Sequence, residues 1–79
     1  MPGSAPNPRS SQCSIKQRLL ARVEEIDLRI YDLDGQDLEA LRMGDSGQSF
    51  ELDDRIREAR EQRRAAVEEL AAHIREHGC

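Results

Sequence analysis

The sequence predicts an all-α protein: an antiparallel hairpin of two helices over residues 14–43 and 49–77. Charged residues make up 35% of the 79-residue chain and aromatic residues 3%, a composition typical of long solvated helices or coiled coils. Apolar residues recur every three or four positions in both segments, which is the helical period. Helix breakers cluster between the segments, in "GDSGQ" at 44–48, where we expect the bend of the hairpin.

The first thirteen residues differ in composition from the rest of the chain. Residues 1–13 hold all three prolines and show no apolar period. Such a segment cannot contribute to a hydrophobic core and is typical of an extended or disordered arm. We therefore expect an N-terminal arm over 1–13 and a helical hairpin domain over 14–79.

The first predicted helix carries two apolar lines. Ser14 is suited to cap its N-terminus. The main line has heptad-like spacing and consists of Ile15, Leu19, Val23, Ile26, Ile30 and Leu33. A second line lies about 100° around the helix and consists of Leu20, Tyr31 and Leu38, with Leu28 near its edge. A helix with two such lines needs more than one neighbour to cover them.

The second predicted helix begins at Ser49, where acidic residues in the next turn suit the positive end of the helix dipole. Its apolar line consists of Leu52, Ile56, Ala59, Arg63, Val67, Leu70 and Ile74. Gly78 is expected to end this helix as a C′ glycine. The alternative is a short strand at 49–54, because Phe50 and Leu52 alternate with polar residues, and it would give a helix–β-turn–helix fold of the α+β class.

The two predicted helices together form one layer, and one layer exposes much of its apolar surface. We expect that surface to be covered by self-association into a helical bundle, or by docking on a partner protein. The predicted association face consists of Leu20, Ile30, Tyr31, Leu38, Val67, Leu70 and Ile74.

Charged residues predict how the two helices align. If residue 43 lies opposite residue 49, an acidic stretch of the first helix faces an arginine-rich stretch of the second. The predicted pairing residues are Asp32, Asp34 and Asp37 on the first helix and Arg57 and Arg60 on the second. Exposed pairs contribute only about 0.2–1 kcal/mol each, so we expect them to specify the register more than the stability. Gly35, in the same acidic stretch, is expected to mark a kink or a helix boundary.

The sequence does not support a metal site. In an EF-hand loop starting at Asp32, position six would be Asp37 instead of glycine and position twelve would be Met43 instead of glutamate. A second hypothesis places a zinc ion or a disulfide at the open end of the hairpin. The residues suited to it are Cys13, His73, His77 and Cys79. Their spacing matches no standard zinc motif, so we expect ordinary thiols and imidazoles and no metal.

Other classes of function have little support in the sequence. No nucleophile with a plausible base and no glycine-rich phosphate loop is present, so we expect no catalysis, no cofactor and no small-molecule substrate. The net charge of −4 argues against nucleic-acid binding, which needs concentrated positive charge. No apolar run approaches the roughly 18 residues of a membrane span, and the N-terminus has no signal-peptide core. We expect a protein of the cytoplasm or of a virus particle.

A turn reading "SGQSFELDD" followed by "RIREAREQRRAAVEELAAHI" resembles the small helical head–tail joining and neck proteins of tailed phages. The resemblance covers residues 38–74, and its specific part is Gly47, Gln48, Ser49 and Phe50. It implies a non-enzymatic structural subunit that acts in virion assembly by packing against neighbouring proteins in a ring or shell. The alternative function is a small soluble regulator that inhibits a larger host protein by laying a helix face in its groove.

Overall fold

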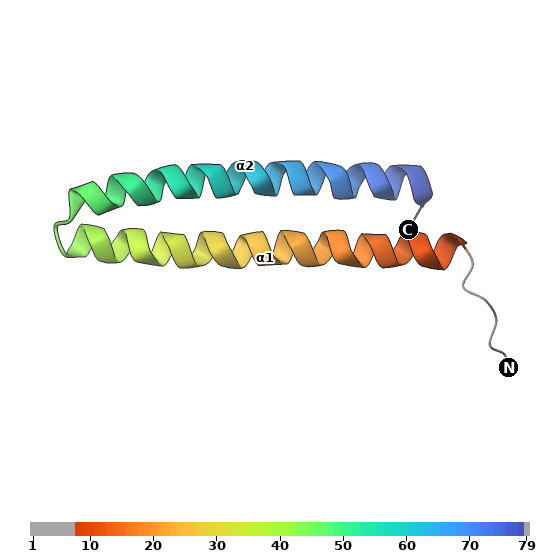
Figure 1. Ribbon diagram of the computed structural model, residues 1–79, viewed down its shortest axis with the longest axis horizontal. Coiled ribbons are helices and arrows are strands. Elements are labelled where there is room, and N and C mark those ends of the chain that lie inside the picture. The colour runs from red at the N-terminus through yellow and green to blue at the C-terminus, as the bar shows by residue number, and fades with distance from the viewer. Residues whose placement is uncertain (1–7, 79) are drawn as a thin grey trace, which may run out of the picture.

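A computed structural model describes residues 8–78 of the chain, with side chains from residue 14 onward. Two antiparallel helices make up the fold: α1 spans Pro8–Arg42 and α2 spans Ser46–His77 (Figure 1). A tight turn joins them at one end, the turn end, and the start of α1 lies beside the end of α2 at the other, the open end. Residues 8–78 contain no strand, so the all-α hairpin is confirmed and the alternative strand at 49–54 is wrong.

Helix α1 begins earlier than the sequence predicted. It starts at Pro8, so residues 8–13 are helical and Ser14 lies inside the helix instead of capping it. Proline suits the first position of a helix because its fixed φ is close to the helical value and its missing N–H needs no acceptor there. The prediction of an arm over 1–13 is therefore wrong for residues 8–13, and residues 1–7 lie outside the described part.

The turn at residues 43–45 is built from two complementary caps. Gly44 has a positive φ of 76°, and its N–H donates to the Leu41 carbonyl oxygen at 3.1 Å. The Asp45 N–H donates to the Ala40 carbonyl oxygen at 2.8 Å, which completes a Schellman motif and ends α1. The carboxylate of Asp45 then accepts a hydrogen bond from the Gln48 N–H at 3.1 Å and so caps α2.

The cap at Asp45 moves the start of α2 three residues ahead of the predicted cap, Ser49. Ser49 is therefore buried inside the helix, where its hydroxyl donates to Asp37 Oδ1 at 2.6 Å. The shorter turn also changes the register. In an antiparallel hairpin, the numbers of two residues that lie opposite each other add to a nearly constant sum. This sum is 86 for Asp37 and Ser49 and 90 for Asp27 and Arg63. The predicted alignment, with residue 43 opposite residue 49, requires a sum of 92.

The structure confirms one of the two predictions about glycines and contradicts the other. Gly78 ends α2 as predicted, with φ +70° and its N–H bonded to the Ile74 carbonyl oxygen at 2.8 Å. Gly35 marks no boundary, because α1 is continuous through it and its φ is not positive. Nothing lies within 4 Å of the position that a Cβ would take there. Gly35 therefore weakens the helix without making a close contact that requires glycine.

The helices pack along one line of residues on each, which we call the seam. Its members on α1 are Leu19, Val23, Ile26, Ile30, Leu33, Asp37 and Ala40, and on α2 they are Ser49, Leu52, Ile56, Ala59, Arg63, Ala66, Leu70 and His73. Every one of them except Arg63 is buried or half-buried. Alternating spacings of three and four are those of positions a and d in a coiled coil, so the hairpin is an antiparallel two-stranded coiled coil.

The predicted apolar line of the second helix departs from the seam in its C-terminal part. Ala66 and His73 are buried, whereas Val67 and Ile74, which the prediction placed on the line, are 37% and 39% exposed. Helices that coil around each other keep a 3.5-residue period, and the predicted step of four residues from Arg63 to Val67 breaks that period.

The most deeply buried part of the seam lies toward the turn end. The core cluster consists of Leu33, Ala40, Leu52, Ile56 and Ala59, with Ile30 packed against it. Even so, no side chain in the described part of the chain is less than 2% exposed. A single layer of two helices is too thin to enclose a side chain completely, so the hairpin has a small core for its length.

Candidate interaction face

A second line of side chains runs along each helix at positions b and e of the heptad. With the seam counted as a and d, this line lies about 100° around each helix from the seam. Its members on α1 are Leu20, Glu24, Asp27, Tyr31, Asp34, Leu38 and Leu41, and on α2 they are Phe50, Asp53, Arg57, Arg60, Arg64, Val67, Ala71 and Ile74. Because the helices are antiparallel, the e positions of both lie on the same side of the seam, and the two lines form one surface, which we call the outer face.

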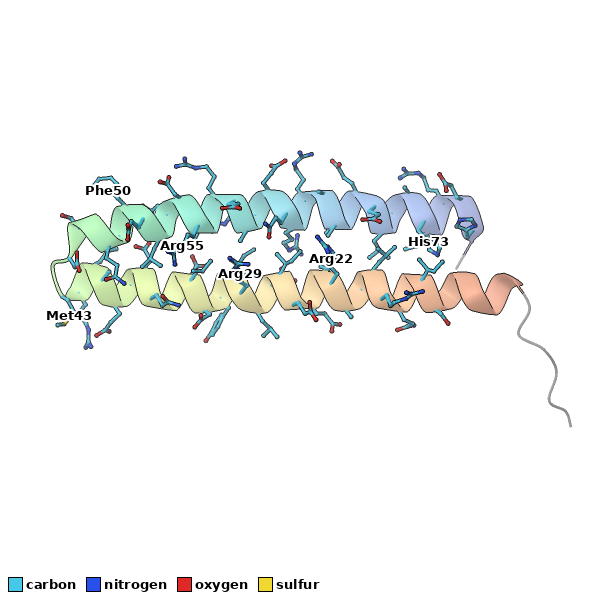
Figure 2. The ribbon with its side chains drawn as sticks, viewed as in Figure 1. Arg22, Arg29, Met43, Phe50, Arg55 and His73 are labelled. Atoms are coloured by element: carbon cyan, nitrogen blue, oxygen red, sulfur yellow. The ribbon has the colours of Figure 1, made fainter. Side chains whose placement is uncertain are left out.

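Large apolar side chains are exposed at the turn end of the outer face. Tyr31, Leu38 and Phe50 are 81%, 69% and 73% exposed, and Leu41 is also exposed. Figure 2 shows Phe50 pointing away from α1, so the other helix of the hairpin does not cover it. Toward the open end the apolar members are Leu20, Val67, Ala71 and Ile74. Apolar groups therefore occupy both ends of the outer face.

The middle of the outer face is charged, and the two helices contribute opposite signs. The charged members from α1 are all acidic: Glu24, Asp27 and Asp34. Those from α2 are Arg57, Arg60 and Arg64, with Asp53 as the one acid. A groove between the helices runs through this region, and its charged lining includes Asp34, Asp37, Asp53, Arg57, Arg60 and Arg64.

Most of the described ion pairs of this region join two residues of the same helix, and one joins the two helices. Arg57 lies 3.5 Å from Asp54, and Arg64 contacts both Glu61 and Glu68. Asp27 and Arg63 join the two helices at 2.5 Å. Arg64 also holds the pKa of Glu61 below its ordinary value of 4.5, mainly through their hydrogen bond. In contrast, Asp34 and Arg60 make no ion pair within the described part of the chain, so both are available to a partner.

Two carboxylates meet at the turn end of the groove. A hydrogen bond with Asp37 is the main cause that raises the pKa of Asp53 above its ordinary value of 3.8, and Arg57 acts in the opposite direction. Asp37 also accepts the hydroxyl of Ser49. The pair is repulsive when both carboxylates are ionised, so this corner of the outer face is sensitive to protonation.

The predicted charge-pairing residues lie near one another without forming the predicted pairs. Four of them line the groove: Asp34, Asp37, Arg57 and Arg60. Asp32 lies elsewhere and accepts a hydrogen bond from Gln36 on its own helix at 2.9 Å. Among the described residues no ion pair joins the predicted acids to the predicted arginines. The reason is the register, because the shorter turn displaces the helices from the alignment that the sequence predicted.

The predicted association residues divide between two surfaces. Ile30 and Leu70 lie in the seam, where each faces the other helix of the hairpin. The remaining five lie on the outer face: Leu20, Tyr31, Leu38, Val67 and Ile74. Sequence reasoning missed Phe50 and Leu41 as members of this face. The signal was present, because continuing the seam of α2 back to Ser49 places Phe50 at position b.

The opposite flank of the seam, at position g, is mainly polar. Figure 2 shows Arg22, Arg29 and Arg55 along the line between the two helices, and Met43 pointing away from α2. The other members of this flank in the described helices are mostly polar: Gln36, Gln48, Gln62, Glu69 and Glu76. This flank offers few apolar contacts, so the outer face is the stronger candidate for binding.

Two histidines lie together at the open end. The ring centroids of His73 and His77 are 4.7 Å apart, and His73 is buried. The hypothesis of a zinc site or disulfide also involves Cys13 and Cys79, whose side chains lie outside the described residues. Among side chains 14–78 no group of three or more metal-binding residues comes together. The structure therefore gives this four-residue set no test.

Over the described residues, neither α1 nor α2 combines the length and the apolar character needed to cross a membrane. Comparisons with protein-family models, with curated proteins and with solved structures found no match to this chain.

Proposed function

We propose that this chain is a non-enzymatic structural subunit that binds other protein chains through its outer face during assembly of a tailed-phage virion. The observation that carries the proposal is the exposure of Tyr31, Leu38 and Phe50 on one surface of a small hairpin. Contiguous exposed apolar side chains on a small protein mark a surface for binding another protein. The virion setting follows from the resemblance of residues 38–74 to head–tail joining and neck proteins.

The small core of the hairpin supports the same function. A two-helix layer in which no described side chain is less than 2% exposed gains little stability from burial. Chains of this size commonly become stable by joining a larger assembly. Binding at the outer face would add a second buried interface at right angles to the seam, and so supply the burial that the hairpin lacks.

A second candidate function uses the same surface. A small regulator can inhibit a larger host protein by laying an amphipathic helix face in an apolar groove. The exposed members of α1, Tyr31 and Leu38, have the helical spacing that such a groove would accept. The two functions differ in the partner, because one predicts virus particles and the other predicts a single host protein.

The test is to change the outer face and follow what the chain binds. An affinity-tagged chain carrying Leu38→Ser and Phe50→Ser should no longer copurify with virus particles. Its helical circular-dichroism signal should be retained, because both side chains are already exposed in the hairpin. Met43→Ser is the matched control, since Met43 is 72% exposed but lies outside the outer face. It should bind as the unmodified chain does.

Each outcome of this test points to a different conclusion. Capture of one host protein in the absence of particles would favour the regulator. Unchanged binding by the double variant would show that the outer face is not the binding surface. Loss of helicity in the double variant would instead mean that Leu38 and Phe50 belong to the core of the fold.

A further inference from the structure

Building on the proposed function, we propose that the outer face binds a second copy of this chain about a two-fold axis parallel to the helices. The product is a four-helix bundle in which both turns lie at the same end. In this arrangement α1 of each copy packs against α2 of the other copy. The partner, the orientation and the pairs of residues in contact all follow from the positions and charges of the outer face.

The first support is the angle between the two lines of each helix. The seam and the outer face lie about 100° apart, close to the right angle at which a helix in a square four-helix bundle meets its two neighbours. Each helix can therefore keep its seam contact within the hairpin and pack its outer face on a helix of the second copy. No rearrangement of the hairpin is needed.

Two symmetric arrangements bring the outer faces of two copies together. If the two-fold axis runs parallel to the helices, α1 of one copy lies on α2 of the other and both turns are at one end. If the axis runs across the helices, α1 lies on α1, α2 lies on α2, and the turns are at opposite ends. Both arrangements give antiparallel neighbours, so helix packing alone does not choose between them.

The charges choose the axis parallel to the helices. The α1 side of the outer face carries Glu24, Asp27 and Asp34, and the α2 side carries Arg57, Arg60 and Arg64. An axis parallel to the helices places the acids of one copy on the arginines of the other. An axis across the helices places acids on acids and arginines on arginines, and like charges in contact cost several kcal/mol.

The register brings individual acids and arginines to the same level. Residue numbers at one level of the hairpin add to between 86 and 90. A two-fold axis parallel to the helices does not change the position of a residue along the helix axis. The same sums therefore identify residues of the two copies that lie at one level. Asp27 then lies beside Arg60 of the second copy, and Glu24 beside Arg64. Arg60 makes no ion pair in the described part of the hairpin, whereas Asp27 already pairs with Arg63 and Arg64 with Glu61 and Glu68, so these contacts would add to ion pairs that the hairpin makes by itself.

The same register pairs the apolar groups at both ends. Leu38 lies level with residues 48–52 and so meets Phe50 of the second copy. Leu20 lies level with residues 66–70 and meets Val67. Between them, Tyr31 lies level with Arg57, whose guanidinium can stack on the ring. One pair does not bring opposite charges together, because Asp53 of α2 lies near Asp34 of the second copy. Arg57 lies one helical turn from Asp53.

Cysteine cross-linking tests the arrangement. Cys13 and Cys79 are first replaced by serine, and a tagged chain with Leu38→Cys is mixed with an untagged chain with Phe50→Cys. Mild oxidation should then link the two chains by a disulfide. Met43→Cys mixed with Phe50→Cys is the control and should give no link above background. Preferential linking of Leu38→Cys to a chain with Leu20→Cys would overturn the proposal, because the axis across the helices places those residues together.

Charge reversal provides an independent test that needs no cysteine. Arg57→Glu with Arg64→Glu should weaken the dimer by about tenfold or more in sedimentation equilibrium. Glu24→Arg with Asp34→Arg should weaken it similarly and leaves the pair of Asp27 and Arg63 intact. Mixing the two variants should restore association. If neither variant weakens the dimer, the acids and arginines of the two copies are not in contact and the proposal fails.

This proposal and the proposed function fail in different ways. A chain that sediments as a monomer at all accessible concentrations would overturn the second-copy proposal. The proposed function would stand if Leu38→Ser with Phe50→Ser still abolished binding to virus particles. The outer face would then be occupied by another protein.

Discussion

The two halves of the seam differ in how well they are buried. In the turn half, the described cluster of Leu33, Ala40, Leu52, Ile56 and Ala59 is buried throughout. In the open half only part of the seam is buried, since Leu19, Val23 and Leu70 remain half-exposed. The turn explains the difference, because two caps fix the chain there and hold the helices in register. We infer that the turn half provides most of the stability of the hairpin.

The largest predicted effect is on the free energy of unfolding, and it is tested by replacing one leucine from each half of the seam. Leu52→Ala should lower the free energy of unfolding by about 2–5 kcal/mol, because it empties a site that is 3% exposed. Leu70→Ala should cost clearly less, because Leu70 is only half-buried. Denaturant unfolding at one fixed protein concentration measures both. Equal losses would show that the two halves contribute equally.

The next effect concerns the turn itself. Gly44→Ala should destabilise the hairpin by about 1–2 kcal/mol, because Gly44 has φ +76° and residues with a Cβ are strained there. Gly47→Ala is the matched control, since its Cβ would meet nothing closer than 3.8 Å and alanine favours a helix. Thermal unfolding of both variants distinguishes these results. Equal melting temperatures would mean that the turn does not fix the register.

A smaller effect of opposite sign is expected within α1. Gly35→Ala should stabilise the protein by about 1 kcal/mol, because Gly35 is helical and its Cβ would meet nothing within 4 Å. The gain should appear as a higher denaturant midpoint with an unchanged slope. A loss of stability would indicate that Gly35 occupies a conformation that alanine cannot adopt, and would contradict a continuous α1.

The smallest effect depends on pH. The contact with Asp37 raises the pKa of Asp53, so folding favours protonated Asp53, and that contribution is lost as pH rises from 3.8 through the raised pKa. Asp53→Asn should therefore raise the melting temperature at pH 7, and the gain should shrink as the pH is lowered toward 3.8. Asp54→Asn is the control, because Asp54 is exposed and pairs with Arg57. A gain that does not depend on pH would argue against the carboxylate contact.

Local chemistry made much of the fold predictable from the sequence. The periodicity of apolar residues predicts two helices, and Gly78 predicts the end of the second one through its own backbone preference. The sequence predicts the bend at 44–48, which overlaps the observed turn at 43–45. Its precise start was missed because Asp45 and Ser49 are both good caps, and only the backbone geometry at Gly44 makes Asp45 the one that is used.

The composition of the outer face was only partly predictable. Tyr31 and Leu38 were found because their spacing shows a second apolar line. Phe50 was missed because the predicted apolar line of the second helix begins at Leu52, two residues after it. Ile30 and Leu70 were assigned to the association face although they lie in the seam. Sequence period identifies apolar lines, but it does not reveal which line faces which neighbour.

By itself the sequence determined the class of fold, the two helices and the presence of more apolar surface than one hairpin can bury. These features depend on residues close together in the chain, whose propensities and spacing act locally. Only the tertiary structure decided that Ala66 and His73 are buried in place of Val67 and Ile74, and that Asp34 and Arg60 are left without an ion pair in the described hairpin. These features depend on the register between helices, which the length of the turn sets and the 3.5-residue coiled-coil period then carries along the seam.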